Sequence, residues 1–290
     1  MHWRPAAAAD ASLLAALATA TSADPVTPDE AAAFMRSWSV ELATLGETGA
    51  AAAVAVLPPT PGHRRGHGAW WSRRGVDSEI ISRLVGLATA TPELQILRVS
   101  TGDPAEQVVL RAQGFDEGYP VWTMTHDNTT WPDGPPALPA NLRSAGWADV
   151  SATAFYTTYE QAYRDQRLVE PHNAETLNQL VTDTAFAPDL STFAVAPDGQ
   201  VAGFVLACVN ARNEVELGPI GTDPAHRGRG ISSALLAATL TRCRTTRQAP
   251  ITLTVDAQSP TGAHRLYLRR GFRITRHLDV QHLHLPPHGR

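Results

Sequence analysis

The residues of this chain that are best suited to chemistry gather in one stretch of its C-terminal half, from Val215 to Arg244. Within this stretch an apolar run leads into a turn of sequence HRGRGIS (226–232), and an amphipathic, helix-like pattern follows directly. The first backbone N–H groups of a helix have no partner inside the helix, and the helix dipole adds partial positive charge there. The turn therefore predicts an anion site.

Glycine and arginine make this turn suitable for a phosphate group. Gly228 and Gly230 allow the backbone to close on a pyrophosphate without a Cβ atom in the way. The forked donors of Arg227 and Arg229 match phosphate oxygens. Neither the G-x-x-x-x-G-K-[ST] loop nor the G-x-G-x-x-G spacing of known nucleotide sites is present. The pattern indicates a phosphorylated cofactor, and a plain surface turn is the alternative.

A second patterned stretch lies downstream, at 251–272. Its first residues, 251–255, alternate between apolar side chains and threonine, as in a strand with one buried face. After a turn at 259–262, apolar residues follow helical spacing up to Gly271, which is placed to end the helix at a C′ position. Phe272 then opens a last strand.

Together the two stretches resemble the signatures of the GNAT superfamily of N-acetyltransferases. The turn is similar to the acyl-CoA motif [QR]-x-x-G-x-[GA], with Arg227, Gly230 and Ser232 at the defined positions, although Ser232 departs from the usual Gly or Ala. The second stretch is similar to the landmark N-x-x-A-x-x-L-Y-x-x-x-G-F and matches it at Ala263, Leu266, Tyr267, Gly271 and Phe272. Pro260 stands where that landmark has Asn, and Ser259 is the nearest polar residue.

The resemblance implies an acyl-CoA site, with acetyl-CoA as the donor and no metal. In this superfamily the pantetheine arm lies like an extra strand between two splayed parallel strands, which puts the strand 215–222 beside it. Gly218 and Pro219 in that strand are typical of a bulge. The expected cofactor-binding residues are Ile220, Gly221, Thr222, Arg227, Gly228, Arg229, Gly230, Ile231, Ser232 and Ser233.

The implied reaction is direct transfer of an acyl group to an amine, which needs a general acid, a general base and a donor to the developing oxyanion. Tyr267 matches the tyrosine of the landmark and is the expected acid, with a core aromatic as the alternative. Glu216 alternates with apolar Val215 and Leu217 and is the expected base. Glu214 has the same side-chain parity and competes with it, and a solvated strand carboxylate is the remaining alternative.

Acceptor specificity is expected from the helical segment that precedes the first hairpin of the C-terminal half. Tyr156, Tyr159 and Tyr163 fall on one helical stripe there, a pattern more often found in a core than in a binding site. A cleft-facing Asp165 or Glu170 would favour a cationic acceptor.

The N-terminal half repeats this organisation in weaker form. Residues 72–87 can be laid over the C-terminal turn and helix, with Gly75 over Gly230. That alignment puts Ser72 where the phosphate-binding arginine should be and Asp77 where a small residue should be. Because a carboxylate repels a pyrophosphate, the N-terminal copy is expected to be a structural scaffold. The HRRGHG run at 63–68 is an alternative phosphate loop.

The predicted fold is therefore α/β, a tandem GNAT fold of two mixed, mostly antiparallel sheets flanked by helices. The expected domains are a degenerate one at 1–128 and a catalytic one at 146–290, joined by a Pro-rich linker at 129–145. At 290 residues the chain is long for one such domain and long enough for two.

Composition excludes several other classes of protein. A net charge of −4 leaves no overall basic footprint for nucleic acid, and two cysteines do not indicate a disulfide framework. No apolar run of about 18 residues predicts a membrane span, and Asp10 interrupts the Ala-rich start that could imitate a signal peptide. A cytoplasmic monomer or homodimer is expected.

The expected function is acetyl-CoA-dependent N-acetylation of a primary amine on a small molecule. Tandem proteins with one degenerate half resemble the mycothiol synthases, which acetylate a cysteinyl amine, and the self-resistance acetyltransferases for amine-rich peptide antibiotics. The eroded first half favours the antibiotic group. A non-catalytic acyl-CoA-binding regulator and an enzyme that acetylates protein amines are the alternatives, since fold alone does not determine the acceptor.

Overall fold

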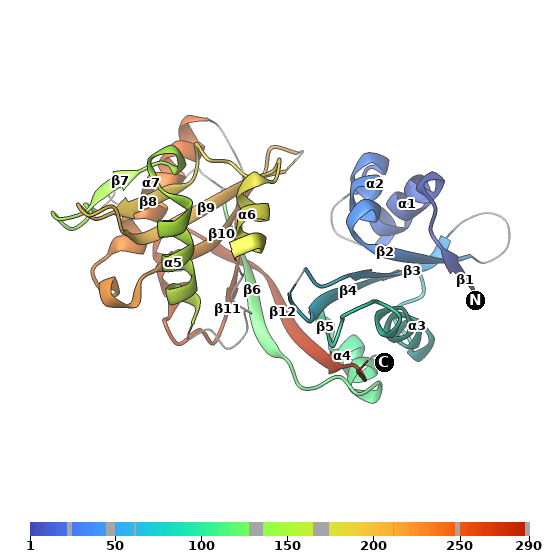
Figure 1. Ribbon diagram of the computed structural model, residues 1–290. Coiled ribbons are helices and arrows are strands. Elements are labelled where there is room, and N and C mark those ends of the chain that lie inside the picture. The colour runs from blue at the N-terminus through green and yellow to red at the C-terminus, as the bar shows by residue number, and fades with distance from the viewer. Residues whose placement is uncertain are drawn as a thin grey trace. The chain divides into compact units, whose positions relative to one another are not determined.

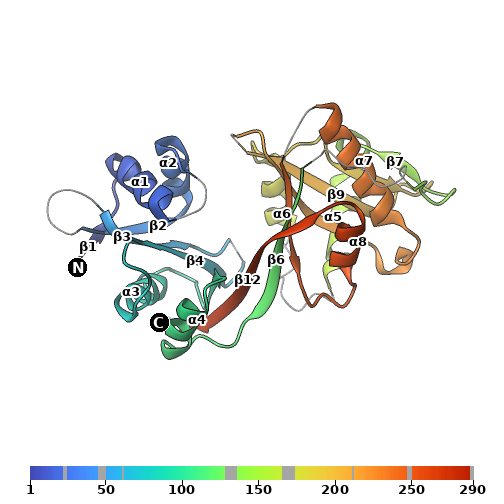
Figure 2. The ribbon, with the colours of Figure 1, turned by 180° about the vertical axis from the view of Figure 1, so that it is seen from behind.

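The computed structural model describes residues 1–21, 25–44, 50–60, 62–127, 136–164, 174–210, 212–246 and 250–287. These residues form two compact units (Figures 1 and 2), of which unit 1 comprises Met1–Tyr119 with Leu278–Arg290 and unit 2 comprises Pro120–His277. The first part of the expected linker, 129–135, lies outside the described residues. Its last three residues, Arg143–Ala145, form strand β7 rather than a loop, because they pair with Phe193–Val195.

Unit 1 is a mixed sheet with helices on both faces. Its strand order is β1-β2-β3-β4-β5-β12, and only β4 and β5 are parallel among the pairs described. The side chains of β3 alternate, so that Ala53 and Ala55 pack with α1 and α2 while Val54 and Val56 pack with α3. The strands are β1 (His2–Pro5), β2 (Ser39–Thr44), β3 (Ala50–Leu57), β4 (Arg65–Ser72), β5 (Ile96–Thr101) and β12 (Arg273–His284), and the helices are α1 (Ala11–Thr21), α2 (Pro28–Ser37), α3 (Ser78–Thr89) and α4 (Pro104–Ala112).

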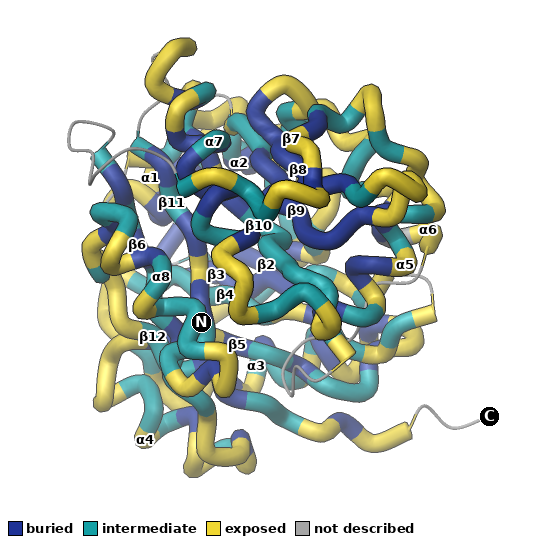
Figure 3. Tube along the Cα trace, turned by 90° about the vertical axis from the view of Figure 1, so that its left-hand side faces the viewer, coloured by how far each residue is buried: buried dark blue, intermediate teal, exposed yellow. Residues whose placement is uncertain are grey.

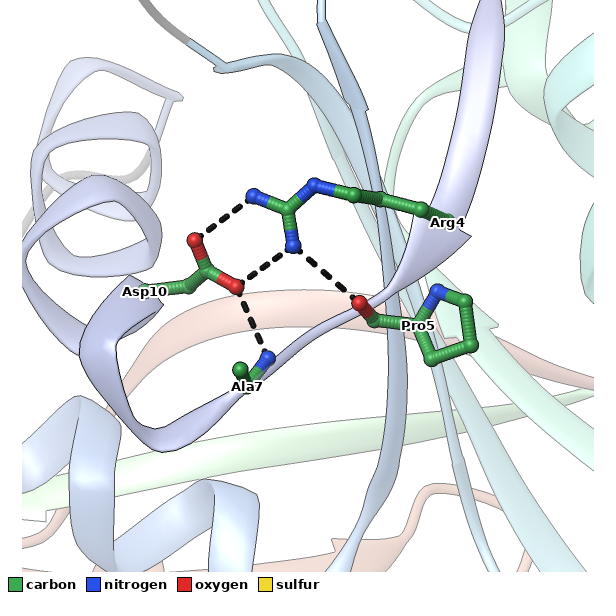
Figure 4. A network of polar contacts seen from close by, with 4 residues as sticks. All are labelled: Arg4, Pro5, Ala7 and Asp10. Carbon is green, nitrogen blue, oxygen red and sulfur yellow. Dashed lines mark hydrogen bonds and ion pairs between the residues drawn. The ribbon is translucent and has the colours of Figure 1, made fainter.

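An ion pair at the start of unit 1 turns the chain from β1 into α1 (Figure 4). Both terminal nitrogens of Arg4 donate to the Asp10 carboxylate, at 2.6 and 2.7 Å, and Asp10 also accepts from the backbone N–H of Ala7 at 2.7 Å. The hydrogen bond from Arg4 is the main cause that lowers the pKa of Asp10. The Arg-Pro start of the chain therefore serves its local structure.

Unit 2 has the same layered organisation, with the order β12-β6-β11-β10-β9-β8-β7. Strands β8 and β9 are buried over most of their length (Figure 3). Phe204 and Leu206 of β9 pack with α5, in front of the sheet in Figure 1, while Val205 and Ala207 pack with α7, in front in Figure 2. The strands are β6 (Tyr119–His126), β7 (Arg143–Ala145), β8 (Thr192–Val195), β9 (Val201–Val209), β10 (Val215–Thr222) and β11 (Ile251–Asp256), and the helices are α5 (Ala152–Tyr163), α6 (Ala174–Thr182), α7 (Ile231–Thr245) and α8 (Ala263–Arg269).

Each sheet includes a strand from the opposite half of the sequence. Residues Val121–His126 of β6 pair antiparallel with β11 in unit 2. Residues Asp279–His284 of β12 pair antiparallel with β5 in unit 1. The two halves of the sequence therefore exchange strands, and neither sheet is complete within one half of the chain.

The architecture confirms the predicted α/β class, because both sheets are mixed, mostly antiparallel and covered by helices. None of the helices in the described part of the chain has the length and apolar character needed to cross a membrane.

Candidate active site

Strands β10 and β11 of unit 2 part along their length. Their parallel register covers Val215 with Ile251 and Glu216 with Thr252, although β10 continues to Thr222. On its other side β10 stays paired with β9 up to Thr222, with a register shift between Leu217 and Ile220. The bulge that Gly218 and Pro219 predicted is thus confirmed, and it lies where the two parallel strands separate. A backbone edge is left there that a ligand could pair with.

Tyr163, the last residue of α5, reaches this edge with its phenol. The hydroxyl accepts from the Ile220 N–H at 3.2 Å and donates to the Ile220 carbonyl at 3.1 Å. Burial raises the pKa of Tyr163 to about 12, so the phenol is neutral at physiological pH. The stripe of tyrosines suggested a core position, and periodicity alone could not show that one hydroxyl of the stripe meets the separated strand.

The glycine turn leads into α7, and no side chain of the N-cap residue caps the first backbone N–H groups of this helix. Gly228 and Gly230 have φ values of 76° and 78°, the left-handed conformation that glycine adopts most easily. Gly230 is the N-cap of α7 and supplies no side-chain cap, so the N–H groups of Ile231, Ser232 and Ser233 lack intrahelical partners. No atom of the described chain lies within 4 Å of where a Cβ would stand at either glycine. The helix start therefore opens onto free space.

The arginine side chains of the turn differ in what they contact. Arg227 donates to the carbonyl of Ala162 at 3.0 Å and to that of Thr222 at 3.4 Å. It therefore ties the end of α5 to the end of β10. Arg229 is exposed and lies between the two glycines.

The hydroxyls of the first turn of α7 also have protein partners. Ser232 is hydrogen-bonded to the Thr222 hydroxyl at 2.5 Å, which joins the helix start to β10. Ser233 accepts from Arg270 Nη2 at 2.6 Å and from its Nε at 3.1 Å. Arg270, at the end of α8, thus brings a guanidinium beside the start of α7, a placement that its position in an arginine-rich segment did not single out.

Tyr267 is a buried residue of α8 and packs against Phe272, with ring centroids 6.0 Å apart. The helix ends as expected, because Gly271 has a φ of 86° and Phe272 N–H bonds back to the Tyr267 carbonyl. Burial, and secondly the nearby Tyr163, raise the pKa of Tyr267 above its usual range. Within the described residues no hydrogen bond of its hydroxyl is found.

Glu216 is exposed on the face of β10 opposite Val215 and Leu217, which are buried. It lies across from Cys208 of β9, whose pKa is raised mainly by burial and further by the charges of Glu216 and Asp183. The competing Glu214 instead accepts from the Asn210 amide at 2.7 Å in the turn between β9 and β10. Asp165 and Glu170 lie outside the described residues.

The corresponding turn of unit 1 differs at the helix cap. Strands β4 and β5 also pair in parallel only from Arg65 to His67, but the N-cap of α3 is Asp77, whose carboxylate accepts from the Ile80 N–H at 3.0 Å. A negative charge therefore occupies the helix start that Gly230 leaves open in unit 2.

The expected alignment of the two turns was two residues off. Counted back from the N-caps Asp77 and Gly230, Gly75 corresponds to Gly228, and Arg74 rather than Ser72 corresponds to Arg227. The helix start, set by the capping carboxylate, decides this register. The HRRGHG alternative is also wrong, because most of it belongs to strand β4.

Comparisons with known proteins agree with this geometry. Residues 152–272 match the acetyltransferase (GNAT) family. A mycothiol acetyltransferase of Cellulomonas flavigena is 27% identical over 242 residues, which cover 76% of this chain and 64% of that protein, less than two thirds of its length.

Two solved structures have the same fold along the whole chain. A GCN5-related N-acetyltransferase from Sphaerobacter thermophilus has a TM-score of 0.80 at 21% identity, with 99% of this chain and 96% of that chain covered. A tandem GNAT protein from the clavulanic acid biosynthesis pathway has a TM-score of 0.73 at 17% identity, with 99% of both chains covered. The tandem arrangement predicted from the sequence is thereby confirmed.

Proposed function

This chain is a tandem protein of the GNAT acetyltransferase superfamily, and we propose that it transfers an acetyl group from acetyl-CoA to a primary amine of a small molecule. The observation that carries this proposal is the separation of β10 from β11 beside the uncapped start of α7. The first feature offers a backbone edge to a pantetheine arm, and the second offers N–H donors to a pyrophosphate.

The cofactor would be held mainly by backbone. The N–H groups of Ile231, Ser232 and Ser233 lie at the positive end of the α7 dipole and have no side-chain cap from Gly230. Arg229 and Arg270 add charge beside them, while Arg227 acts by fixing the turn to α5 and β10. The carboxylate of Asp77 caps the equivalent helix in unit 1, so we propose one site per chain, in unit 2.

The acceptor amine must lose a proton before it attacks. With a pKa near 10.4, roughly one amine in a few thousand is neutral at pH 7. Glu216 is the proposed base, acting through water, because it is exposed on the strand that carries the site. The nitrogen lone pair then forms the C–N bond, and the carbonyl π pair moves onto oxygen, where the Ile220 N–H can donate to it.

Collapse of this intermediate restores the carbonyl and breaks the C–S bond, and the electron pair leaves with sulfur. Tyr267 is the proposed acid that protonates this sulfur to give the free thiol of coenzyme A. Because burial keeps the phenol protonated, its proton transfer is expected to accompany C–S cleavage. The nitrogen is cationic once the C–N bond has formed, and it loses its second proton through solvent as the intermediate collapses. Of the two protons that the amine gives up, one restores the phenol and the other is released to solvent.

Two acceptor classes suit this site. The eroded cofactor turn of unit 1 favours an amine-rich small molecule, such as a peptide antibiotic that is acetylated for self-resistance. The similarity to a mycothiol acetyltransferase favours a cysteinyl amine as the second candidate. Since acetyl-CoA is the donor, we propose that the enzyme works in the cytoplasm.

A library of amines, including basic peptide antibiotics, aminosugars and cysteinyl compounds, tests the function through release of the coenzyme A thiol. We expect turnover with at least one class, and calorimetry should show one acetyl-CoA bound per chain. Acetyl-CoA binding without turnover on any amine would favour the regulator. A stoichiometry of two would refute the single site.

Tyr267→Phe tests the acid. Turnover should fall about 10²–10⁴-fold, the usual range for a positioned acid, while acetyl-CoA affinity stays nearly unchanged because the ring still packs on Phe272. Tyr156→Phe, which removes a phenol hydroxyl from α5, is the control. Turnover of Tyr267→Phe that equals that of the control would reduce Tyr267 to a core aromatic.

A further inference from the structure

The Tyr163 phenol is hydrogen-bonded to both the backbone N–H and the backbone carbonyl of Ile220 at the proposed site. Its oxygen accepts from the Ile220 N–H at 3.2 Å, and its O–H donates to the Ile220 carbonyl at 3.1 Å. In a regular sheet these edge groups would pair with a neighbouring strand. Since β11 pairs with β10 only at Val215 and Glu216, the phenol takes the place of a strand neighbour.

Two contacts hold the phenol at this position. Its ring stacks on Tyr159 with centroids 4.6 Å apart and planes inclined by 20°. Arg227 of the cofactor turn donates to the carbonyl of Ala162, the residue before Tyr163. The end of α5 is thus connected to the turn that would bind the pyrophosphate, and the phenol is positioned rather than merely packed.

We propose that Tyr163 is a second donor to the thioester oxygen. This inference rests on the proposed function, in which the same Ile220 N–H donates to that oxygen. When the thioester arrives, its oxygen replaces the phenol oxygen on the Ile220 N–H, and the Tyr163 O–H turns from the Ile220 carbonyl to the thioester oxygen. The oxygen then has two donors, one from the backbone and one from a side chain.

The two phenols would have different tasks in the reaction. As the C–N bond forms, the carbonyl π pair becomes a lone pair on oxygen, and Tyr163 stabilises that negative charge by a hydrogen bond without giving up its proton. As the C–S bond breaks, Tyr267 gives its proton to sulfur. Tyr163 therefore acts on the oxygen and Tyr267 on the sulfur, from α5 and α8 respectively.

Tyr163→Phe in the full chain tests this assignment, with Tyr156→Phe of the same helix as the matched control. Removal of one oxyanion donor typically lowers kcat about 10²–10³-fold, and we expect a loss in this range for Tyr163→Phe at nearly unchanged affinity for acetyl-CoA. The control should retain the kcat of the unchanged protein. A kcat of Tyr163→Phe within a factor of about two of the control would overturn the proposal.

A spectroscopic readout separates this role from a structural one. Acetyl-CoA labelled with ¹³C at the acetyl carbonyl should show a C=O stretch at lower frequency when bound to the unchanged protein than when free in solution. In Tyr163→Phe the bound C=O frequency should lie closer to the value in free solution, whereas in Tyr156→Phe it should equal that of the unchanged protein. An identical bound frequency in Tyr163→Phe and the unchanged protein would refute a hydrogen bond to the carbonyl.

The failure of this inference is distinguishable from failure of the proposed function. If the unchanged protein binds no acetyl-CoA, the proposed function fails and the inference falls with it. If the unchanged protein binds and turns over acetyl-CoA while Tyr163→Phe matches it in kcat and carbonyl frequency, only the role of Tyr163 is refuted.

Discussion

The substitution Gly230→Ala separates what the glycine turn does for folding from what it does for the cofactor. Gly230 has a φ of 78°, and an L-residue in the left-handed conformation costs about 1–2 kcal/mol. The new Cβ would meet no described atom within 4 Å, so no repacking cost adds to this strain. For a unit of this size the melting temperature should fall by roughly 2–4 °C per kcal/mol.

Cofactor affinity should fall for a different reason. The backbone strain is present in the free and the bound protein alike, so it cancels from the binding free energy. Any loss of affinity therefore reports the methyl group, which would project into the open space where a pyrophosphate would lie. We expect acetyl-CoA to bind at least about tenfold more weakly, which corresponds to about 1.4 kcal/mol.

Gly75→Ala is the matched control, because Gly75 has a φ of 82° and its Cβ position is equally open. Thermal unfolding should show a similar loss of stability in both variants, whereas calorimetry should show weaker acetyl-CoA binding only in Gly230→Ala. Equal, undiminished affinity in both variants would refute the placement of the pyrophosphate at the start of α7.

Three further outcomes are expected. Glu216→Gln should lower kcat, whereas Glu214→Gln, which loses a turn contact, should keep it; equal kcat values in the two variants would exclude Glu216 as the base. Deletion of Met1–Asp127 removes β6 and leaves β11 without its antiparallel neighbour, so this fragment should be less soluble than one that begins at Tyr119; equal soluble yields would show that β6 is dispensable. Burial and Arg98 lower the pKa of His282 to about 4. Between about pH 6.5 and 4 the unfolded chain therefore binds more protons than the folded protein, and the free energy of unfolding should fall as the pH is lowered. Urea unfolding at pH 7 and pH 5 should show a smaller fall of this free energy in His282→Gln than in the unchanged protein; an equal fall in both would refute the lowered pKa of His282.

Local features of unit 2 could be predicted from its sequence. The glycine turn before α7, the C′ glycine after α8 and the bulge in β10 all depend on residues within a few positions of one another. Backbone conformation, capping and side-chain alternation act over this short range. The α/β class and the tandem arrangement followed from the order of such features along the chain.

The register of the unit 1 turn was predicted wrongly for a local reason. Gly75 offered the obvious match to Gly230, but Asp77 caps α3, so the helix begins two residues later than that match required. A capping carboxylate and a glycine can both precede a helix, and spacing alone does not tell which of them marks its first residue.

Tertiary structure decided which distant residues meet. The exchange of β6 and β12 joins Val121–His126 to β11 and Asp279–His284 to β5. The sequence of neither strand indicates which strand it pairs with. Likewise, the Tyr163 hydroxyl reaches Ile220 because α5 packs across the sheet where β10 leaves β11. The sequence by itself determined the elements and the turn that presents free N–H groups, because these depend on local backbone preferences. The partners of those elements depend on packing between residues far apart in the chain, which only the folded structure brings together.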